Sequence, residues 1–290
     1  MKIHTIIKNG VPLASEAATA AHAENLPSAA CGDFHSYLCC QLCGRMKINM
    51  AEFCDLWCGG PKFAQAAHFR LSTDCVLLSD FVNTGAARRA IDLGCASGAV
   101  MLLLLARTER LHMTGIEILP EAVELARENM AVNAFDGRSA LVCGDIRAHR
   151  ELFKAGSFDL AAANPPYFPV DRGALSPFGG RSSARGESLC TLDDICAAAA
   201  WLLRTGGNFC LVHKPERLSE IFCAMVKHGL EPKRLRLVEN RAGAKPSLVL
   251  VEAKRGGKPG LSIEPPLILT EADGAPTEEY KRIYHIKTTP

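Results

Sequence analysis

Short apolar runs alternate with longer amphipathic runs along residues 90–228 of this chain. The short runs have the length of buried strands, and the longer runs have the spacing of helices. The predicted strands are Ala90–Leu93, Met113–Glu117, Ala140–Cys143, Phe158–Ala163 and Asn208–His213, and the predicted helices are Val100–Arg107, Pro120–Asn133, Leu192–Leu203 and Glu216–His228. Strands that alternate with helices build a parallel sheet with helices on both faces, so the pattern predicts an α/β fold.

The two ends of the chain differ from this alternation. After Gly229, the strand-like runs Leu235–Val238 and Leu248–Ala253 flank a basic turn with glycine and proline, which predicts a closing antiparallel hairpin. With it the sheet has seven strands, most of them parallel. The first residues show no clear period. We therefore predict a poorly defined N-terminal extension over residues 1–49, which an overextended gene start would explain, and a single domain over residues 50–290.

Composition and charge narrow the class of protein. Of the 290 residues, 48% are hydrophobic and 22% are charged, as in ordinary globular proteins. A net charge of +2 provides no global field that steers the chain to a polyanion, so local patches must hold any nucleic acid. The longest wholly apolar run, Ile195–Leu203, is too short to cross a bilayer, and the N-terminus lacks the apolar core of a signal peptide. We expect a cytoplasmic protein with no membrane partner.

The chain contains thirteen cysteines, which could form disulfides, hold a metal or fill the core. A reducing cytosol keeps thiols free, so we expect no disulfide-linked partner. A four-thiolate zinc site is an alternative, from Cys40, Cys43, Cys54 and Cys58; our prediction assigns no metal. Four other cysteines lie in runs that predict core positions: Cys95, Cys143, Cys196 and Cys210.

A glycine-containing turn, Asp92-Leu93-Gly94-Cys95-Ala96-Ser97-Gly98, follows the first predicted strand. Gly94 and Gly98 let the backbone turn tightly and approach a ligand, as glycines do at the first βα turn of nucleotide-binding folds. The spacing is not G-x-G-x-x-G, and Asp92 closes the strand. These features argue against a dinucleotide pyrophosphate and favour a cationic or amine-bearing ligand. A turn that merely needs glycine is the alternative.

Two more acids follow the next two predicted strands. Glu117 ends the second strand, where it can accept hydrogen bonds from both ribose hydroxyls of an adenosine. Asp145 follows the third strand, within reach of an adenine amino group. Either acid alone could be a helix cap or a solvated loop residue. Three acids at successive strand ends favour a binding site, because open α/β sheets bind ligands along that edge.

In this order the residues resemble the class I S-adenosylmethionine-dependent methyltransferases. In that superfamily the D-x-G-x-x-x-G loop, here Asp92 to Gly98, holds the methionine part, the acid at Glu117 binds the ribose, and the pair Gly144-Asp145 meets the adenine. The resemblance covers about residues 70–253 and implies a Rossmann-like fold with S-adenosyl-L-methionine as cofactor. The predicted cofactor-binding residues are Asp74, Asp92, Gly94, Ser97, Gly98, Glu117, Ile118, Asp145, Ile146 and Asn164.

The fourth strand ends in Asn164-Pro165-Pro166-Tyr167, which looks like the signature of methyltransferases that act on a planar nitrogen. An adenine amino nitrogen shares its lone pair with the ring and is a poor nucleophile. If the Asn164 side-chain oxygen and the Pro165 carbonyl accept its N–H bonds, the nitrogen moves toward tetrahedral geometry. The prolines stiffen the turn, and Tyr167 can stack on the base. We predict these four residues as catalytic.

The flanks of this motif are similar to the bacterial tRNA1(Val) adenine-37 N6-methyltransferase family. The similarity rests on Phe69–Asp74 with Leu77-Leu78, on the arginine-containing loop 171–186, and on Leu261–Pro266. It runs from about residue 55 to the C-terminus and departs in the first fifty residues and at Gly186. It implies a tRNA partner whose anticodon-loop adenine is extruded for reaction.

Basic residues indicate where RNA would bind. Residues 227–258 contain nine Lys or Arg against three acids, a local charge of +6, and three arginines follow the catalytic motif. The predicted RNA-contacting residues are Arg172, Arg181, Arg185, Lys233, Arg241 and Lys245, with Arg234 and Arg236 as further phosphate contacts. A solvated face of edge strands is the alternative use of the basic stretch.

Two other functions stay open. Asn-Pro-Pro-Tyr also occurs in enzymes that methylate the N5 amide nitrogen of a glutamine in a translation factor. The chain could also be a non-catalytic module that binds the cofactor together with RNA or a partner. Such a module would have the same cofactor-binding residues at the strand ends but would transfer no methyl group.

Overall fold

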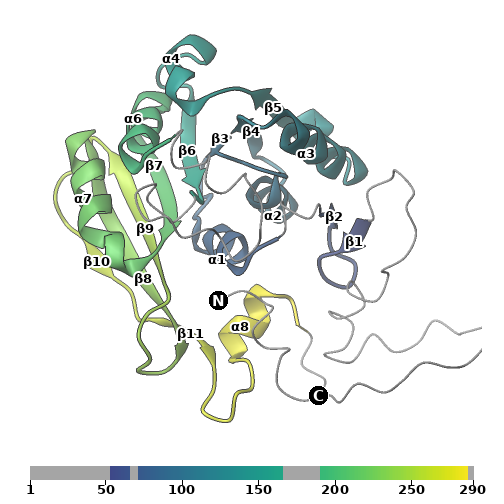
Figure 1. Cartoon of the computed structure of the whole chain (residues 1–290), viewed down its shortest axis with the longest axis vertical. Helices are drawn as coiled ribbons and strands as arrows, with labels where there is room; N and C mark the ends of the chain where they lie inside the picture. The colour runs from purple at the N-terminus through teal and green to yellow at the C-terminus, as the bar shows by residue number, and fades with distance from the viewer. Residues whose placement is uncertain (1–52, 66–70, 166–189, 287–290) are drawn as a thin grey trace, which may run out of the picture.

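The computed structural model describes residues 53–65, 71–165 and 190–286 (Figure 1). Its centre is a nine-stranded sheet with helices on both faces. Five adjacent strands are parallel: β3 (Arg89–Leu93), β4 (His112–Glu117), β5 (Ser139–Cys143), β6 (Phe158–Ala163) and β7 (Leu203–His213). All five lie within a few residues of the predicted runs, because each is a short apolar segment bounded by polar or turn residues.

Helices connect these parallel strands, as the alternation predicts. The connecting helices are α2 (Ala99–Arg107), α3 (Pro120–Val132), α4 (His149–Leu152), α6 (Leu192–Leu202) and α7 (Leu218–Lys227). Three short 3-10 turns accompany them: η3 (Asp136–Arg138), η4 (Ile146–Ala148) and η5 (Pro215–Arg217). Helix α6 begins with a capping box in which Thr191 and Asp194 exchange hydrogen bonds, so its start is fixed by the sequence itself.

The predicted closing hairpin is present as β8 (Leu230–Arg241) and β9 (Leu248–Arg255), with β9 antiparallel to both β7 and β8. These complete the seven predicted strands. Two short strands that the prediction lacks, β10 (Ser262–Ile263) and β11 (Leu267–Thr270), pair with β8. A final short helix, α8 (Glu278–Ile283), follows.

The order of the strands creates a crevice beside β3. Across the sheet the order is β10-β8-β9-β7-β6-β3-β4-β5, with β11 also on β8. From β3 the chain therefore builds β4 and β5 on one side and later places β6 and β7 on the other. Open α/β sheets bind ligands at such a reversal, outside the carboxyl ends of the strands.

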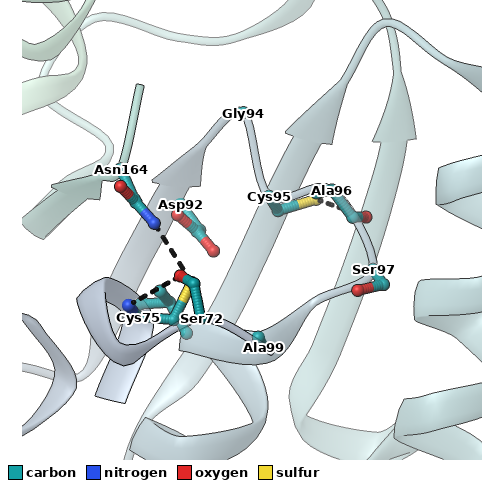
Figure 2. Close-up of a pocket in the computed structure, with 10 residues that line it drawn as sticks. Ser72, Cys75, Asp92, Gly94, Cys95, Ala96, Ser97, Ala99 and Asn164 are labelled. Carbon is teal, nitrogen blue, oxygen red and sulfur yellow. Dashed lines mark hydrogen bonds between the residues drawn. The ribbon is translucent and has the colours of Figure 1, made fainter. Parts of the chain in front are cut away.

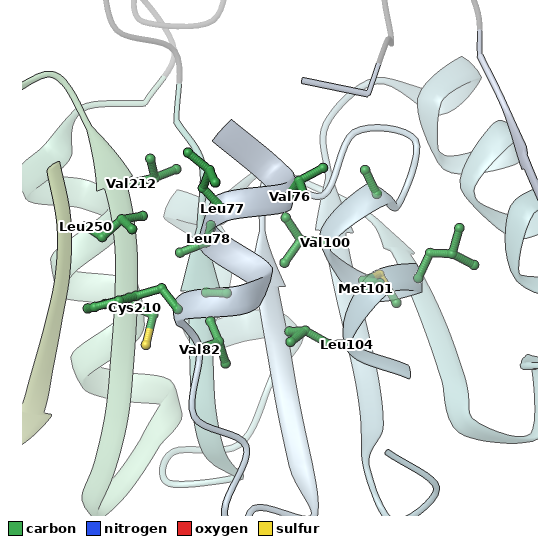
Figure 3. Packing of buried hydrophobic residues seen from close by; sticks show 14 of the residues in the cluster. Val76, Leu77, Leu78, Val82, Val100, Met101, Leu104, Cys210, Val212 and Leu250 are labelled. Carbon is green, nitrogen blue, oxygen red and sulfur yellow. The ribbon is translucent and has the colours of Figure 1, made fainter. Parts of the chain in front are cut away.

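Side chains of successive strand residues enter two separate cores, one on each face of the sheet. Cys210 and Val212 of β7 pack with α1 and α2 on one face, while Phe209 and Leu211 pack with α6 and α7 on the other. Figure 3 shows the first core, where Leu77 and Leu78 of α1 meet this face of the sheet. This burial on both faces explains why the strands are apolar throughout.

Three N-terminal elements were not predicted. Strands β1 (Phe53–Asp55) and β2 (Lys62–Ala64) form a hairpin, and α1 (Thr73–Phe81) packs on the sheet. The buried Asn129 of α3 joins the hairpin to the glycine turn, because its Nδ2 donates to the Ala64 and Ser97 carbonyls at 3.2 and 3.0 Å. Residues 1–49 lie outside the described residues, so the domain boundary stays a prediction.

The cysteine predictions are mostly confirmed. Cys95, Cys196 and Cys210 are buried, whereas the prediction for Cys143 is wrong, because it ends the edge strand β5 and is exposed. No cluster of three metal-ligating side chains occurs in the described ranges, and Cys40 and Cys43 lie outside them. None of the helices in the described part of the chain has the length and apolar character to span a membrane.

Candidate functional site

A pocket of about 150 Å³ lies at the crevice between the carboxyl ends of β3 and β6 (Figure 2). The turn after β3, the first turns of α1 and α2, and the end of β6 surround it. The lining residues are Ser72, Cys75, Asp92, Gly94, Cys95, Ala96, Ser97, Ala99, Val100 and Asn164. The structure thus brings the predicted glycine turn and the predicted catalytic asparagine to one pocket.

The glycine turn has three residues with positive φ. Gly94 and Gly98 have φ of 79° and 81°, which glycine adopts at little cost, and Ala96 has φ of 46°. An alanine in this region costs about 1–2 kcal/mol, and a partly buried hydrogen bond from its N–H to Glu117 Oε2 at 3.0 Å holds it there. A Cβ on Gly98 would also meet Met130 and Ala126 of α3 at 3.2 and 3.3 Å. The turn therefore depends on its glycines.

Glu117 connects two loops of the pocket edge. Its carboxylate is buried, and its Oε1 accepts a hydrogen bond from the Leu119 N–H at 3.0 Å, while Oε2 holds the glycine turn. A carboxylate oxygen has more than one acceptor position, so this arrangement is compatible with the predicted ribose contact. The same side chain therefore holds the glycine turn and the start of the loop after β4 together.

Asp92 lies at the floor of the pocket. It is 2% exposed, and its Oδ2 has no hydrogen-bond partner among the described residues. Burial, together with the nearby negative charge of Glu117, raises the pKa of the Asp92 carboxyl to about 7. A buried carboxylate without a partner is costly. The site therefore suits a ligand that brings a cationic amine, and the ammonium of the methionine part of S-adenosylmethionine has this chemistry.

Asn164 follows β6 directly and faces the pocket. Its side-chain Nδ2 donates a hydrogen bond to Cys75 Sγ at 3.1 Å (Figure 2). Pro165 follows it in the described chain, whereas the predicted residues Pro166 and Tyr167 lie outside the described residues. The structure therefore places half of the predicted catalytic motif.

The remaining predicted cofactor residues lie beyond the pocket lining. Asp145 caps η4 through the Arg147 N–H, and its carboxylate pairs with the Arg147 guanidinium at 2.5 Å, which lowers the pKa of Asp145. A contact to adenine would compete with that pair. Ile118 is 39% exposed beside Glu117, and Ile146 packs near Gly94. Asp74 lies in the first turn of α1, but the pocket is lined by Ser72 and Cys75 instead.

The predicted RNA-contacting residues separate into different regions. Arg241 ends β8 near the start of β9, and β9 begins opposite His213 at the carboxyl end of β7. Arg241 and Lys245 therefore lie at the same sheet edge as Asn164, which is the edge formed by the carboxyl ends of the parallel strands. Lys233 lies toward the opposite edge, where its Nζ donates to the Lys258 carbonyl at 3.2 Å. The loop residues Arg172, Arg181 and Arg185 lie outside the described residues.

Two other arginines of the basic stretch serve the fold. Arg234 pairs with Glu252 and Glu264, each at 3.1 Å, and Arg236 pairs with Glu279 at 2.8 Å. Both side chains are more than two-thirds buried. The structure therefore gives them partners within the chain in place of the predicted RNA phosphates.

Ser72 and Cys75 are pocket residues that the sequence analysis missed. Ser72 is the N-cap of α1, and its Oγ accepts from the Cys75 N–H at 3.3 Å. A serine followed by Asp74 and an apolar run is a recognisable helix start. That signal could have placed Cys75 in the first turn of a helix, but nothing local indicates its contact with Asn164.

Comparison with known proteins identifies the family. The family model of the methyltransferase small domain matches residues 70–225, more than half of the chain. This chain belongs to the methyltransferase small domain family. A curated relative from Porphyromonas gingivalis, named tRNA1(Val) (adenine(37)-N6)-methyltransferase, is 30% identical over 74% of this chain and 86% of its own length. A protein of the same name from Tolumonas auensis is 29% identical, over 73% and 86%.

A solved structure agrees with the fold of this methyltransferase. A structure from Agrobacterium tumefaciens, described as a predicted O-methyltransferase, superimposes with a TM-score of 0.60 at 24% sequence identity, covering 73% of this chain and 96% of its own. The Rossmann-like methyltransferase fold expected from the sequence is thereby confirmed.

Proposed function

We propose that this methyltransferase transfers a methyl group from S-adenosyl-L-methionine to the N6 amino group of an adenine in tRNA, with adenine 37 of tRNA1(Val) as the target. The observation that carries the proposal is that Asn164, at the end of β6, lines the same pocket as Asp92, whose Oδ2 has no hydrogen-bond partner among the described residues. The names of the relatives support this choice of substrate.

The cofactor side of the site is proposed to use Asp92, Glu117 and the glycine turn. Asp92 would accept hydrogen bonds from the cofactor ammonium, and the charge of that ammonium would offset the cost of the buried carboxylate. Glu117 would accept from the ribose hydroxyls. Positive φ at Gly94 and Gly98 brings backbone close to the pocket, where a side chain would exclude the ligand.

The catalytic side is proposed to work by orientation. When bound, S-adenosylmethionine supplies an electrophilic methyl group on its sulfonium. Asn164 Oδ1 and the Pro165 carbonyl would accept the two N–H bonds of the adenine amino group, so that the nitrogen lone pair is directed away from the ring. Fixed acceptors cost no reorganisation during reaction. No strong base is required, because the product nitrogen can lose its proton to water after transfer.

The RNA side is proposed to include Arg241 and Lys245, which share the sheet edge of Asn164, together with Arg172, Arg181 and Arg185. Contacts to phosphate from basic side chains make binding dependent on salt. A tRNA substrate is also in keeping with a cytoplasmic location.

The test is incubation of the purified protein with radiolabelled cofactor and either bulk tRNA or total protein from a deletion strain. Label in tRNA, recovered as N6-methyladenosine by nucleoside mass spectrometry, is expected. Label in protein alone would favour glutamine N5 methylation instead.

The Asn164→Ala variant separates catalysis from binding. It should lose transfer by at least 100-fold, the size of loss seen when an oriented acceptor or donor is removed from a reacting centre. Calorimetry should show cofactor affinity within about threefold of wild type. Absence of turnover with every tRNA in the wild type, with cofactor still bound, would favour the non-catalytic binding module.

A further inference from the structure

The side chain of Cys75 connects α1 to the end of β6. Its Sγ accepts a hydrogen bond from Asn164 Nδ2 at 3.1 Å and another from Ser72 Oγ at 3.3 Å. The Ser72 hydroxyl also caps α1 by accepting from the Cys75 N–H. The sulfur is therefore held from its own helix on one side and contacts the predicted catalytic amide on the other (Figure 2).

An asparagine amide has two ends of similar shape and opposite hydrogen-bonding character. Transfer to an adenine amino group needs the carbonyl oxygen toward the substrate, because the amino group donates. The amide with its NH2 end toward the substrate would place donor against donor. A neighbouring acceptor that binds the NH2 end selects the productive orientation.

We propose that Cys75 is a positioning residue, which holds the NH2 end of Asn164 so that the carbonyl oxygen of the amide is directed to the reacting nitrogen. This inference rests on the proposed function for its catalytic consequence. The hydrogen bond between Asn164 and Cys75, 89 residues apart in the chain, carries it.

The state of the sulfur fits this role. Burial raises the pKa of the Cys75 thiol, and the negative charge of Asp92 adds to the effect. A thiolate is a strong nucleophile and would compete with the substrate for a methyl group on a sulfonium. A neutral thiol accepts the amide N–H without that competing reaction.

Kinetics of three variants test the catalytic consequence. Cys75→Ala removes the acceptor, and kcat should fall about fivefold, as expected from one net hydrogen bond, with the cofactor KM within twofold of wild type. Cys75→Ser keeps an acceptor oxygen and should recover most of kcat. Cys196→Ala is the control, because it removes a buried helix thiol that does not line the pocket; it should lower thermal stability and leave kcat unchanged.

A spectroscopic readout tests the contact without any substrate. The test uses NMR spectra of 15N-labelled full-length protein. The side-chain NH2 signal of Asn164 is assigned as the signal that is absent from the spectrum of the Asn164→Asp variant. We expect this signal to move in Cys75→Ala, to return toward its wild-type position in Cys75→Ser, and to stay in place in Cys196→Ala.

The outcomes separate this inference from the proposed function. An unmoved amide signal in Cys75→Ala, or a moved signal with unchanged kcat, overturns the positioning role. Equal losses of kcat in Cys75→Ala and Cys75→Ser also overturn it, because packing would then explain the effect. If wild-type protein methylates no tRNA, the proposed function fails, and the amide signal alone decides whether Cys75 orients Asn164.

Discussion

The pocket edge and the closing hairpin each contain a charged side chain that is largely buried. At the pocket edge, Asp92 has an oxygen that is buried without a partner in the described residues. In the hairpin, Arg234 is held by Glu252, by Glu264 and by the Phe81 carbonyl, and its guanidinium lies 3.9 Å from the centre of the Phe81 ring. Asp92 lines a pocket, whereas the guanidinium of Arg234 is surrounded by acceptors from the chain itself.

This difference distinguishes a binding group from a structural one. A buried charge is stable when hydrogen bonds and an opposite charge surround it, as at Arg234. A buried charge that lacks them reduces stability, and it is retained where a ligand later supplies the missing partner. In the sequence, Asp92 and Arg234 each stand next to a leucine, Leu93 and Leu235, so the local pattern does not distinguish the two charges.

The largest expected effect is on cofactor binding by Asp92→Asn. The amide cannot neutralise the cofactor ammonium, so the Kd for S-adenosylmethionine should rise about 100-fold, equivalent to about 2.7 kcal/mol. Stability of the ligand-free protein should rise by about 2 kcal/mol near pH 7, because the variant no longer ionises a buried carboxyl. Calorimetry and urea unfolding measure the two effects. Weaker binding together with lower stability would mean that Asp92 is structural, like Arg234.

The converse change is Arg234→Met in the hairpin. Removing this arginine leaves the carboxylates of Glu252 and Glu264 without their partner, so the free energy of unfolding should fall by about 2 kcal/mol, less than for a fully buried pair because the arginine is partly exposed. Cofactor Kd should stay within twofold. Arg110→Met, at an exposed position, is the control and should change stability by less than about 0.5 kcal/mol. A comparable loss of cofactor affinity in Arg234→Met would remove the distinction between the two regions.

The third effect is the pH dependence of cofactor binding. Because the pKa of Asp92 is raised to about 7, its carboxyl is protonated at pH 5.5 and must lose the proton to bind a cation. Affinity should therefore rise about tenfold from pH 5.5 to 7 and should be flat in Asp92→Asn over the same range. A flat profile in the wild type would show that Asp92 is already ionised without ligand.

The same shift predicts how stability changes with pH. The folded pKa lies above the unfolded value of 3.8, so the folded protein holds the proton more tightly. The contribution of Asp92 to the free energy of unfolding is therefore greatest below about pH 4 and declines as pH rises to about 7. Urea unfolding of the wild type and of Asp92→Asn at several pH values in this range measures the contribution of Asp92, because the variant lacks the titrating carboxyl.

The smallest effect concerns the exposed lysines of the closing hairpin region. The Lys245–Glu216 pair is largely exposed, so Lys245→Ala should leave the free energy of unfolding essentially unchanged. Its KM for tRNA should rise about twofold to threefold, with a shallower dependence on salt. Lys233→Ala, toward the other sheet edge, should leave the tRNA KM unchanged. Equal effects of the two variants would show that the location at the Asn164 edge does not matter.

Local pattern was sufficient for the parallel strands and insufficient for the hairpin. Strand β8 is predicted over Leu235–Val238 but extends over Leu230–Arg241. Charged residues that flank the predicted run, such as Arg234, hide this length, because they are compatible with a strand when acids from elsewhere in the chain neutralise them. Helix α1 was missed for the opposite reason. Its residues from Val76 to Leu78 are buried together, so it lacks the polar face that reveals a surface helix.

The sequence by itself determined the fold class and the chemical groups at the strand ends: Asp92 and Glu117 after the first two parallel strands and Asn164 after the fourth. These depend on short-range patterns, in which an apolar run fixes a strand and the next residues fix its turn. Tertiary structure decided which charges have partners, which lysines and arginines share the edge of Asn164, and that Cys75 contacts its amide. Those relations join residues far apart in the chain, and a hydrogen bond or an unpaired buried atom exists only once folding has brought the groups together.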